Sequence, residues 1–197
     1  RAVLLTGKYS HINGVRDNDQ VFDGSQETFP KILQSVGYET AMIGKWHLKS
    51  EPTGFNYWKI LKGQGEYYNP LIVDSAGERN VEGYVTDIIT NLAIETLENR
   101  DKDKPFAMLL HHKAPHRNWM PNLKYLGAFK GKKFPLPETF YDDYSTRSLA
   151  AKESDMRIDN MFLTWDMKLR PGDIEQETGS GGSGQVSGMI RDSYREW

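Results

Sequence analysis

The sequence contains no cysteine among its 197 residues, so disulfide bonds and thiolate metal sites are excluded. No apolar run approaches the roughly 20 residues that a membrane-spanning helix needs. There is no Asn-x-Ser/Thr glycosylation site and no basic-then-apolar signal sequence at the start. With a formal net charge of -2, the chain also lacks the basic excess of a nucleic-acid-binding protein. Hydrophobic residues make up 38%, which is typical of a soluble globular protein rather than a disordered one.

Hydrophobic periodicity predicts helices and strands in alternation, which is the pattern of an α/β fold. Thr28 can cap a helix, Pro30 is tolerated in its first turn, and Gly37 ends it. The expected elements are a helix over residues 2–8, a polar loop over 9–24, a helix over 28–37, a strand over 38–43, loops with one hairpin over 51–80, an amphipathic helix over 84–99 and a buried parallel strand over 106–112.

The last third of the chain has weaker patterns. Residues 113–137 are rich in proline and read as irregular, and residues 141–170 are expected to be helical in part. Residues 179–184 contain only glycine and serine, which is typical of a flexible linker. We therefore predict a main domain over residues 1–178, a linker over 179–184 and a short C-terminal segment of uncertain origin over 185–197.

Lys45 and His47 flank Trp46 directly after a predicted strand, where open α/β sheets place the groups that contact ligands. A lysine ammonium is a point charge suited to a sulfate or phosphate oxygen, and a histidine exchanges a proton near neutral pH. The pattern Lys-x-His alone is also compatible with a solvated lysine and a structural histidine in a surface turn.

A second polar segment, His111 to Trp119, follows the other predicted strand and is expected at the same edge of the sheet. Several histidines suggest zinc, but His111 and His112 are adjacent in a strand and point to opposite faces. No carboxylate lies at metal-ligand spacing, so we predict no metal site here. Trp119 close to Arg117 is compatible with a packed surface pair or with a ligand contact.

Two segments together resemble a known family. Arg1-Ala-Val-Leu-Leu-Thr-Gly-Lys-Tyr9 and Gly37-Tyr-Glu-Thr-Ala-Met-Ile-Gly-Lys-Trp-His-Leu48 resemble the two signatures of type I, formylglycine-dependent sulfatases. In that family the first signature is Cys or Ser-x-Pro-Ser-Arg, followed by a helix that ends in Thr-Gly-Lys or Thr-Gly-Arg. Only its final arginine is present, as Arg1, so the residue that becomes the nucleophile is not in this chain. The aromatic-rich segments over 52–58, 64–70 and 83–87 resemble the branch that acts on N-acetylglucosamine 6-sulfate.

The resemblance implies a fold and a set of roles. The fold would be part of an alkaline-phosphatase-like sulfatase core, a mixed sheet flanked by helices. Arg1 and Lys45 would neutralise the sulfate, and His47 would hold and later deprotonate the formylglycine hydroxyl. The implied leaving-group acid is His116, and the implied sugar contacts are Arg117, Asn118 and Trp119.

The resemblance also implies cofactors that this chain does not supply. Family members bind Ca2+ through acidic residues upstream and an Asp-Asn or Asp-His pair downstream, and these segments are absent. Asp159–Asn160 lies in a stretch expected to be helical, without the strand-loop context of the metal pair. Both the calcium ligands and the formylglycine are therefore expected to be missing here, and the chain alone is expected to be inactive.

The implied function is that of a sulfuric ester hydrolase fragment, whose parent removes 6-O-sulfate from N-acetylglucosamine in sulfated glycans. The alternatives are a non-catalytic sulfoglycan-binding module and a phosphoesterase or phosphonate hydrolase of the same superfamily. Expected partners are a sulfated glycan or amino sugar and the remaining parts of the same enzyme. A periplasmic or extracellular bacterial location is favoured over a lysosomal one, because no glycosylation site is present.

Overall fold

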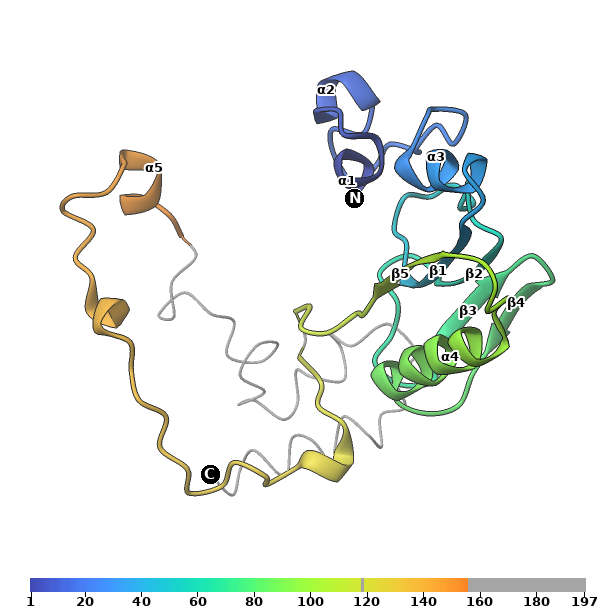
Figure 1. The fold of residues 1–197 in the computed structure, drawn as a ribbon. Helices are drawn as coiled ribbons and strands as arrows, with labels where there is room; N and C mark the ends of the chain where they lie inside the picture. Colours follow the sequence, from blue (N-terminus) through green and yellow to red (C-terminus); the bar gives the residue numbers. More distant parts are fainter. Residues whose placement is uncertain (118, 156–197) are drawn as a thin grey trace. The chain divides into compact units, whose positions relative to one another are not determined.

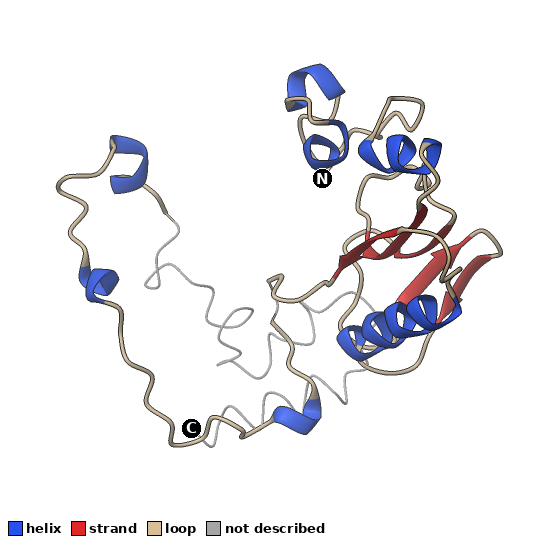
Figure 2. Ribbon diagram, in the orientation of Figure 1, coloured by secondary structure: helices blue, strands red, loops and turns tan. Residues whose placement is uncertain are grey.

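The computed structural model describes residues 1–117 and 119–155. The chain divides into two compact units, Arg1–His116 and Arg117–Trp197. The first unit contains the sheet and its covering helices (Figures 1 and 2). All of the polar residues discussed below as a site belong to this first unit, apart from Arg117, Asn118 and Trp119.

The first unit is built on one mixed sheet of five strands, in the order β4-β3-β2-β1-β5. The central strand β1 pairs in parallel with β2 and β5, whereas β2–β3 and β3–β4 are antiparallel. Six of the seven residues of β1 are buried, as expected of a strand covered on both faces. The strands are β1 (Glu39–Lys45), β2 (Tyr57–Leu61), β3 (Leu71–Asp74), β4 (Gly77–Asn80) and β5 (Phe106–His111).

Helices flank the sheet on both sides (Figure 1). Helix α4 (Val85–Asn99) lies on one side and buries Val85, Ile89 and Ala93, which recur every four residues along one face. The short helices α1 (Ala2–Thr6), α2 (Ser10–Asn13) and α3 (Phe29–Ser35) lie on the other side. The core on that side is formed by Ala2, Leu5, Phe22, Met42, Trp46, Leu48 and Ile60. The predicted mixed α/β sheet flanked by helices is confirmed.

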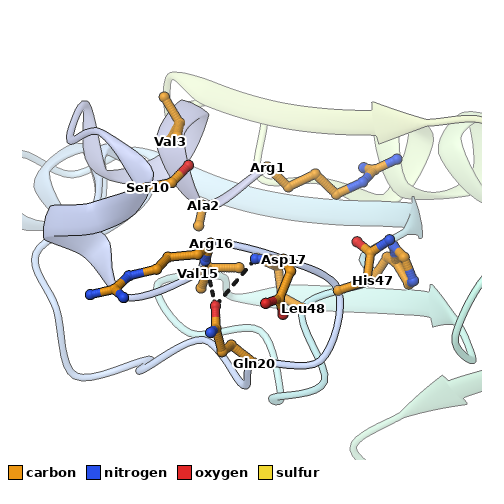
Figure 3. Close-up of a pocket in the computed structure, with 11 residues that line it drawn as sticks. Arg1, Ala2, Val3, Ser10, Val15, Arg16, Asp17, Gln20, His47 and Leu48 are labelled. Carbon is orange, nitrogen blue, oxygen red and sulfur yellow. Dashed lines mark hydrogen bonds between the residues drawn. The ribbon is translucent and has the colours of Figure 1, made fainter.

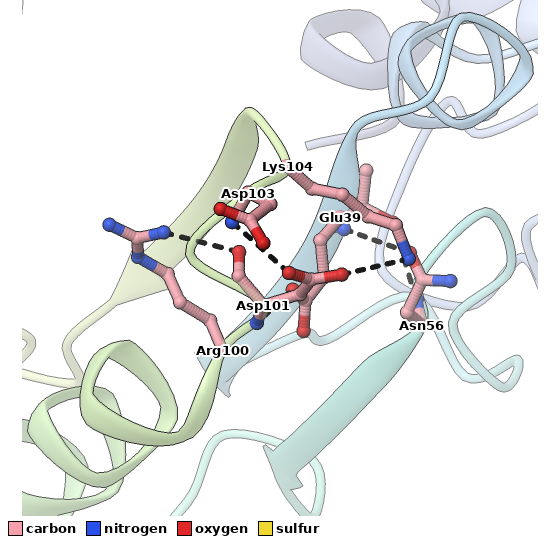
Figure 4. Close-up of polar contacts among 7 residues, drawn as sticks. Glu39, Asn56, Arg100, Asp101, Asp103 and Lys104 are labelled. Carbon is pink, nitrogen blue, oxygen red and sulfur yellow. Dashed lines mark hydrogen bonds and ion pairs between the residues drawn. The ribbon is translucent and has the colours of Figure 1, made fainter.

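Hydrogen bonds hold the starting ends of β1 and β5 together (Figure 4). The Asp101 amide donates to the carboxylate of Glu39 (2.9 Å), and the Glu39 amide donates to the Pro105 carbonyl (2.9 Å). One residue further along β1, the Thr40 amide donates to the side chain of Asn56 (2.9 Å), which precedes β2. These hydrogen bonds align the first residues of the three parallel strands. This alignment fixes the positions of the strands' C-terminal ends.

Several expectations were wrong in detail. A one-turn helix, α2, lies inside the predicted loop over residues 9–24. The hairpin expected within residues 51–80 is present as β3 and β4, but β2 is an additional strand in a region expected to be loop. Strand β1 extends to Lys45, so this residue closes the strand rather than lying in the following loop. The strand β5 was expected to be buried, yet it is the edge of the sheet, and Phe106 and Leu110 are exposed.

The second unit has little regular structure in its described part. It contains two short 3-10 helices, η1 (Leu123–Tyr125) and η2 (Glu138–Tyr141), and the helix α5 (Leu149–Lys152). The linker over residues 179–184, the segment over 185–197 and the pair Asp159–Asn160 lie outside the described residues, so the predicted domain boundaries stay predictions. None of the described helices is long and apolar enough to cross a membrane.

Candidate active site

A buried tryptophan fixes the turn that carries Lys45 and His47. Trp46 is 3% exposed, its indole N–H donates to the Ser50 carbonyl (2.6 Å), and its ring meets Phe55 edge-on. The next residue but one, Leu48, is also buried. His47 between them has a φ of 55°, a left-handed conformation that costs energy for a residue with a β-carbon. The buried side chains of Trp46 and Leu48 therefore fix the backbone that carries Lys45 and His47.

Lys45 is a buried cation at the end of β1, with only 6% of its surface exposed. Its ammonium donates to the side-chain oxygen of Gln64. Burial, followed by the charges of Arg1 and Lys113, lowers the pKa of Lys45 to about 8. Among residues 1–117 and 119–155, no carboxylate forms an ion pair with Lys45. A buried ammonium that lacks an anionic partner is suited to bind an anion.

Arg1 reaches the same place from the start of α1. Its Nη1 donates to the Lys45 carbonyl (2.6 Å) and lies 2.8 Å from Nδ1 of His111, the last residue of β5. Figure 3 shows the Arg1 side chain extending toward the side of the pocket where His47 lies. That pocket has a volume of about 270 Å3 and is lined by Arg1, His47 and the loop around Arg16 and Asp17.

The histidines His47 and His116 complete the cluster. Burial is the largest cause that lowers the pKa of His47, and the charges of Lys45, Arg1 and His116 lower it further. These charge interactions place the four side chains in one electrostatic neighbourhood. The backbone of His116 is fixed by the hydroxyl of Tyr67, which donates to its carbonyl (2.6 Å), and by its own amide, which donates to the Lys113 carbonyl (3.0 Å).

The strand ends can approach because Gly44 has no side chain. Gly44 pairs with His111 across β1 and β5, and a β-carbon on Gly44 would lie 2.0 Å from the His111 carbonyl oxygen. Its φ of 99° is also unfavourable for any residue with a β-carbon. Glycine at this position therefore allows Lys45 and His111 to end their strands side by side.

The structure brings together four of the seven predicted site residues, namely Arg1, Lys45, His47 and His116. The position of the predicted sugar contacts relative to this cluster stays a prediction. Arg117 and Trp119 belong to the second unit, and Asn118 lies outside the described residues. Among the described residues there is also no group of three or more His, Asp or Glu side chains that could hold a metal ion.

Four residues around this cluster were not predicted as site residues. His111 contacts Arg1, and Gln64 accepts hydrogen bonds from Lys45 through its side chain and from Lys113 through its carbonyl (3.4 Å). The Lys113 ammonium lies 4.8 Å from the centre of the Tyr67 ring, a cation–π contact. No local motif marks Gln64 or Tyr67, because both come from the loop after β2 and meet the site only in the fold.

The sequence profile of the sulfatase family matches residues 1–166. The chain belongs to the sulfatase family. The sulfatase relatives include the N-acetylglucosamine-6-O-sulfatase of Bacteroides thetaiotaomicron, 55% identical over 86% of this chain and 31% of its own length. The human N-acetylglucosamine-6-sulfatase is 31% identical over 71% of this chain and 30% of its own length. The chain thus spans about 30% of the length of the curated sulfatases it matches.

A solved structure supports the same sulfatase fold. It is 46% identical to this chain with a TM-score of 0.84, and the match covers 99% of this chain and 42% of the other. That structure shows the protein in complex with its substrate, D-glucosamine-2-N,6-O-disulfate. The likeness assigns the five-stranded sheet to the sulfatase core of the alkaline-phosphatase-like fold.

Proposed function

We propose that this chain provides the cationic part of a sulfatase active site, and that the complete protein removes 6-O-sulfate from N-acetylglucosamine in sulfated glycans. The observation that carries the proposal is the convergence of Arg1, Lys45, His47 and His116 at the ends of β1 and β5. Relatives named as N-acetylglucosamine-6-sulfatases, and a similar protein bound to a 6-O-sulfated amino sugar, support the choice of substrate.

Arg1 and Lys45 have the charge and the burial needed to hold a sulfate group. In sulfate ester hydrolysis, negative charge grows on the oxygens of the reacting group, and cations preorganised in a site of low polarity stabilise it most strongly. Lys45 is buried without a carboxylate partner in the described part of the chain, so it does not need to break an ion pair to bind the anion.

We assign one proton transfer to each of the two histidines. As the bond between sulfur and the sugar oxygen breaks, that oxygen takes a proton, and we assign its donor as His116. His47 is the proposed proton acceptor. Burial and the neighbouring cations lower its pKa, so its imidazole is neutral at neutral pH and can accept a proton.

We assign neither the nucleophile nor the metal of the family's active site to the described residues. In the family that the chain resembles, formylglycine supplies the attacking hydroxyl, and the position that carries it precedes Arg1. The family's Ca2+ needs several oxygen ligands, and the described residues do not gather a set of acidic side chains that fits it. We therefore assign no step of the reaction to calcium within this chain.

The test is an assay of sulfate release from N-acetylglucosamine 6-sulfate. It compares this chain with a protein that also contains the Cys/Ser-x-Pro-Ser segment before Arg1 and the remaining downstream residues, both with calcium present. The complete protein is expected to release sulfate and the chain alone is not. As controls, Lys45→Met in the complete protein is expected to abolish turnover, and Lys62→Met, which changes an exposed lysine paired with Glu78, is expected to have no effect.

Other outcomes would favour the alternatives. Hydrolysis of p-nitrophenyl phosphate but not of the sulfate ester would identify a phosphoesterase. Binding of the sulfated sugar without turnover by the complete protein would identify a sulfoglycan-binding module. Arg117, Asn118 and Trp119 remain proposed sugar contacts, which Trp119→Ala tests through a rise in KM for the sulfated sugar. A periplasmic or extracellular location also stays a prediction.

A further inference from the structure

His111 holds the guanidinium of Arg1 at the centre of the cationic cluster. Nη1 of Arg1 lies 2.8 Å from Nδ1 of His111 and 2.6 Å from the carbonyl oxygen of Lys45. Both distances are short enough for hydrogen bonds. No carboxylate in the described residues forms an ion pair with Arg1. Its orientation therefore depends on one backbone oxygen and one imidazole nitrogen.

The contact determines which tautomer of His111 is present. A guanidinium has five N–H donors and no acceptor, so His111 must offer the lone pair of Nδ1, and its proton must be on Nε2. The 3.2 Å approach of Nδ1 to the Lys45 carbonyl is then not a hydrogen bond, because neither atom carries a proton. Burial and the charge of Arg1 lower the pKa of His111, against a smaller opposing effect of the Lys45 carbonyl. The neutral ring is the form that can accept from Arg1.

The backbone of His111 is held by strand pairing. It is the last residue of β5 and pairs with Gly44 of β1, and the missing β-carbon of Gly44 lets the His111 carbonyl approach closely. Lys45 follows Gly44 directly, so the two acceptors of the Arg1 side chain come from neighbouring strands with a fixed register. Acceptors on paired strands position a side chain better than acceptors on loops.

We propose that His111 is a positioning residue that directs the Arg1 guanidinium at the sulfate group, an inference that rests on the proposed function. Without the Nδ1 acceptor, Arg1 keeps only the Lys45 carbonyl and can rotate about its side-chain bonds. A catalytic cation displaced by about 1 Å can lose on the order of 100-fold in rate.

The test compares His111→Asn with His111→Leu in the complete protein. The two replacements are similar in size and shape, but Asn places its Oδ1 acceptor where histidine has Nδ1, whereas Leu has no acceptor. We expect His111→Leu to lower kcat/KM for N-acetylglucosamine 6-sulfate by about 10- to 100-fold. His111→Asn is expected to retain most of the activity, and both variants should have similar thermal stability. His112→Leu is the control, since His112 has no contact with Arg1 in the described residues.

A second measurement makes the outcome independent of turnover. The affinity of each variant for inorganic sulfate is measured by calorimetry, and we expect about a tenfold loss in His111→Leu but not in His111→Asn. If the wild-type protein hydrolyses no sulfate ester but this difference in affinity is present, the proposed function fails and the positioning role stands. Equal sulfate affinity in the Asn and Leu variants, or equal kcat/KM where turnover occurs, would overturn the role of His111.

Discussion

Replacing Lys45 by methionine should make the protein more stable while abolishing its affinity for sulfate. The pKa of Lys45 falls from 10.5 to about 8 because the ammonium is buried next to other cations. A shift of this size corresponds to about 3 kcal/mol that disfavours the charged form. Solvent near the end of the side chain screens part of this cost, and the hydrogen bond to Gln64 offsets a further part of it. We therefore expect Lys45→Met to raise the free energy of unfolding by about 1–2 kcal/mol at pH 7.

The pH dependence distinguishes this explanation from a simple gain in packing. The pKa of Lys45 is lower in the folded state than in the unfolded state, so the folded protein binds this proton less tightly. Stability of the wild type should then rise with pH from about 8 to 10.5, as the folded form loses the charge while the unfolded form keeps it. The advantage of Lys45→Met should shrink over the same range.

Urea denaturation at pH 7 and about pH 9.5, with and without sodium sulfate, measures both effects. Sulfate stabilises most proteins by exclusion from their surface, so the relevant quantity is the additional stabilisation of the wild type over the variant. Lys31→Met is a matched control, because Lys31 donates to the carbonyls of Gly24 and Gln26, and its loss should destabilise by about 1 kcal/mol. A Lys45→Met protein that is less stable than the wild type at pH 7, or equally stabilised by sulfate, would refute the reasoning.

Three further predictions concern the same strand ends. Gly44→Ala puts a β-carbon 2.0 Å from the His111 carbonyl oxygen, so strand β5 must shift. We expect the free energy of unfolding, measured by chemical denaturation, to fall by about 3 kcal/mol or more. An unchanged free energy of unfolding would contradict the close approach. Tyr67→Phe removes the hydrogen bond to the His116 carbonyl, and we expect about 1 kcal/mol less stability and a lower kcat. Tyr57→Phe, at the end of β2 opposite to the residue that pairs with Lys45, should leave kcat unchanged. Sulfate affinity measured by calorimetry should fall above about pH 8 as Lys45 loses its proton, and a flat profile up to pH 10 would show that Lys45 does not bind the anion.

The fold was predictable from the sequence where local pattern and burial agree. Helix α4 and the parallel pair β1–β5 follow from apolar periodicity and from short apolar runs. Strand β2 was missed because Tyr57–Leu61 is short and lies in a region rich in glycine and asparagine; it is held by its pairing with β1. The one-turn helix α2 was missed because it is stabilised by Asn13, whose buried side chain bonds the backbone on both sides, rather than by an apolar face.

The site was predictable only where its residues fall within the two family signatures or follow a strand. Lys45 ends β1, His47 lies just after it, and His116 lies in the segment that follows β5, so the rule for parallel sheets places them at one edge. Gln64, Lys113 and Tyr67 interact through contacts between segments separated by up to 49 residues. No short-range pattern indicates such contacts, and they emerge only when the loop after β2 packs beside β5.

The cations at the strand ends come from widely separated parts of the first unit: its first residue, the end of β1 and the segment after β5. A bound oxyanion would therefore act as a non-covalent cross-link, tying the beginning of the unit to its last strand. Occupancy of the site should slow amide hydrogen exchange in α1 and along the edge strand, including at residues that the anion does not touch. Ligand binding would then be thermodynamically linked to the folding of this unit.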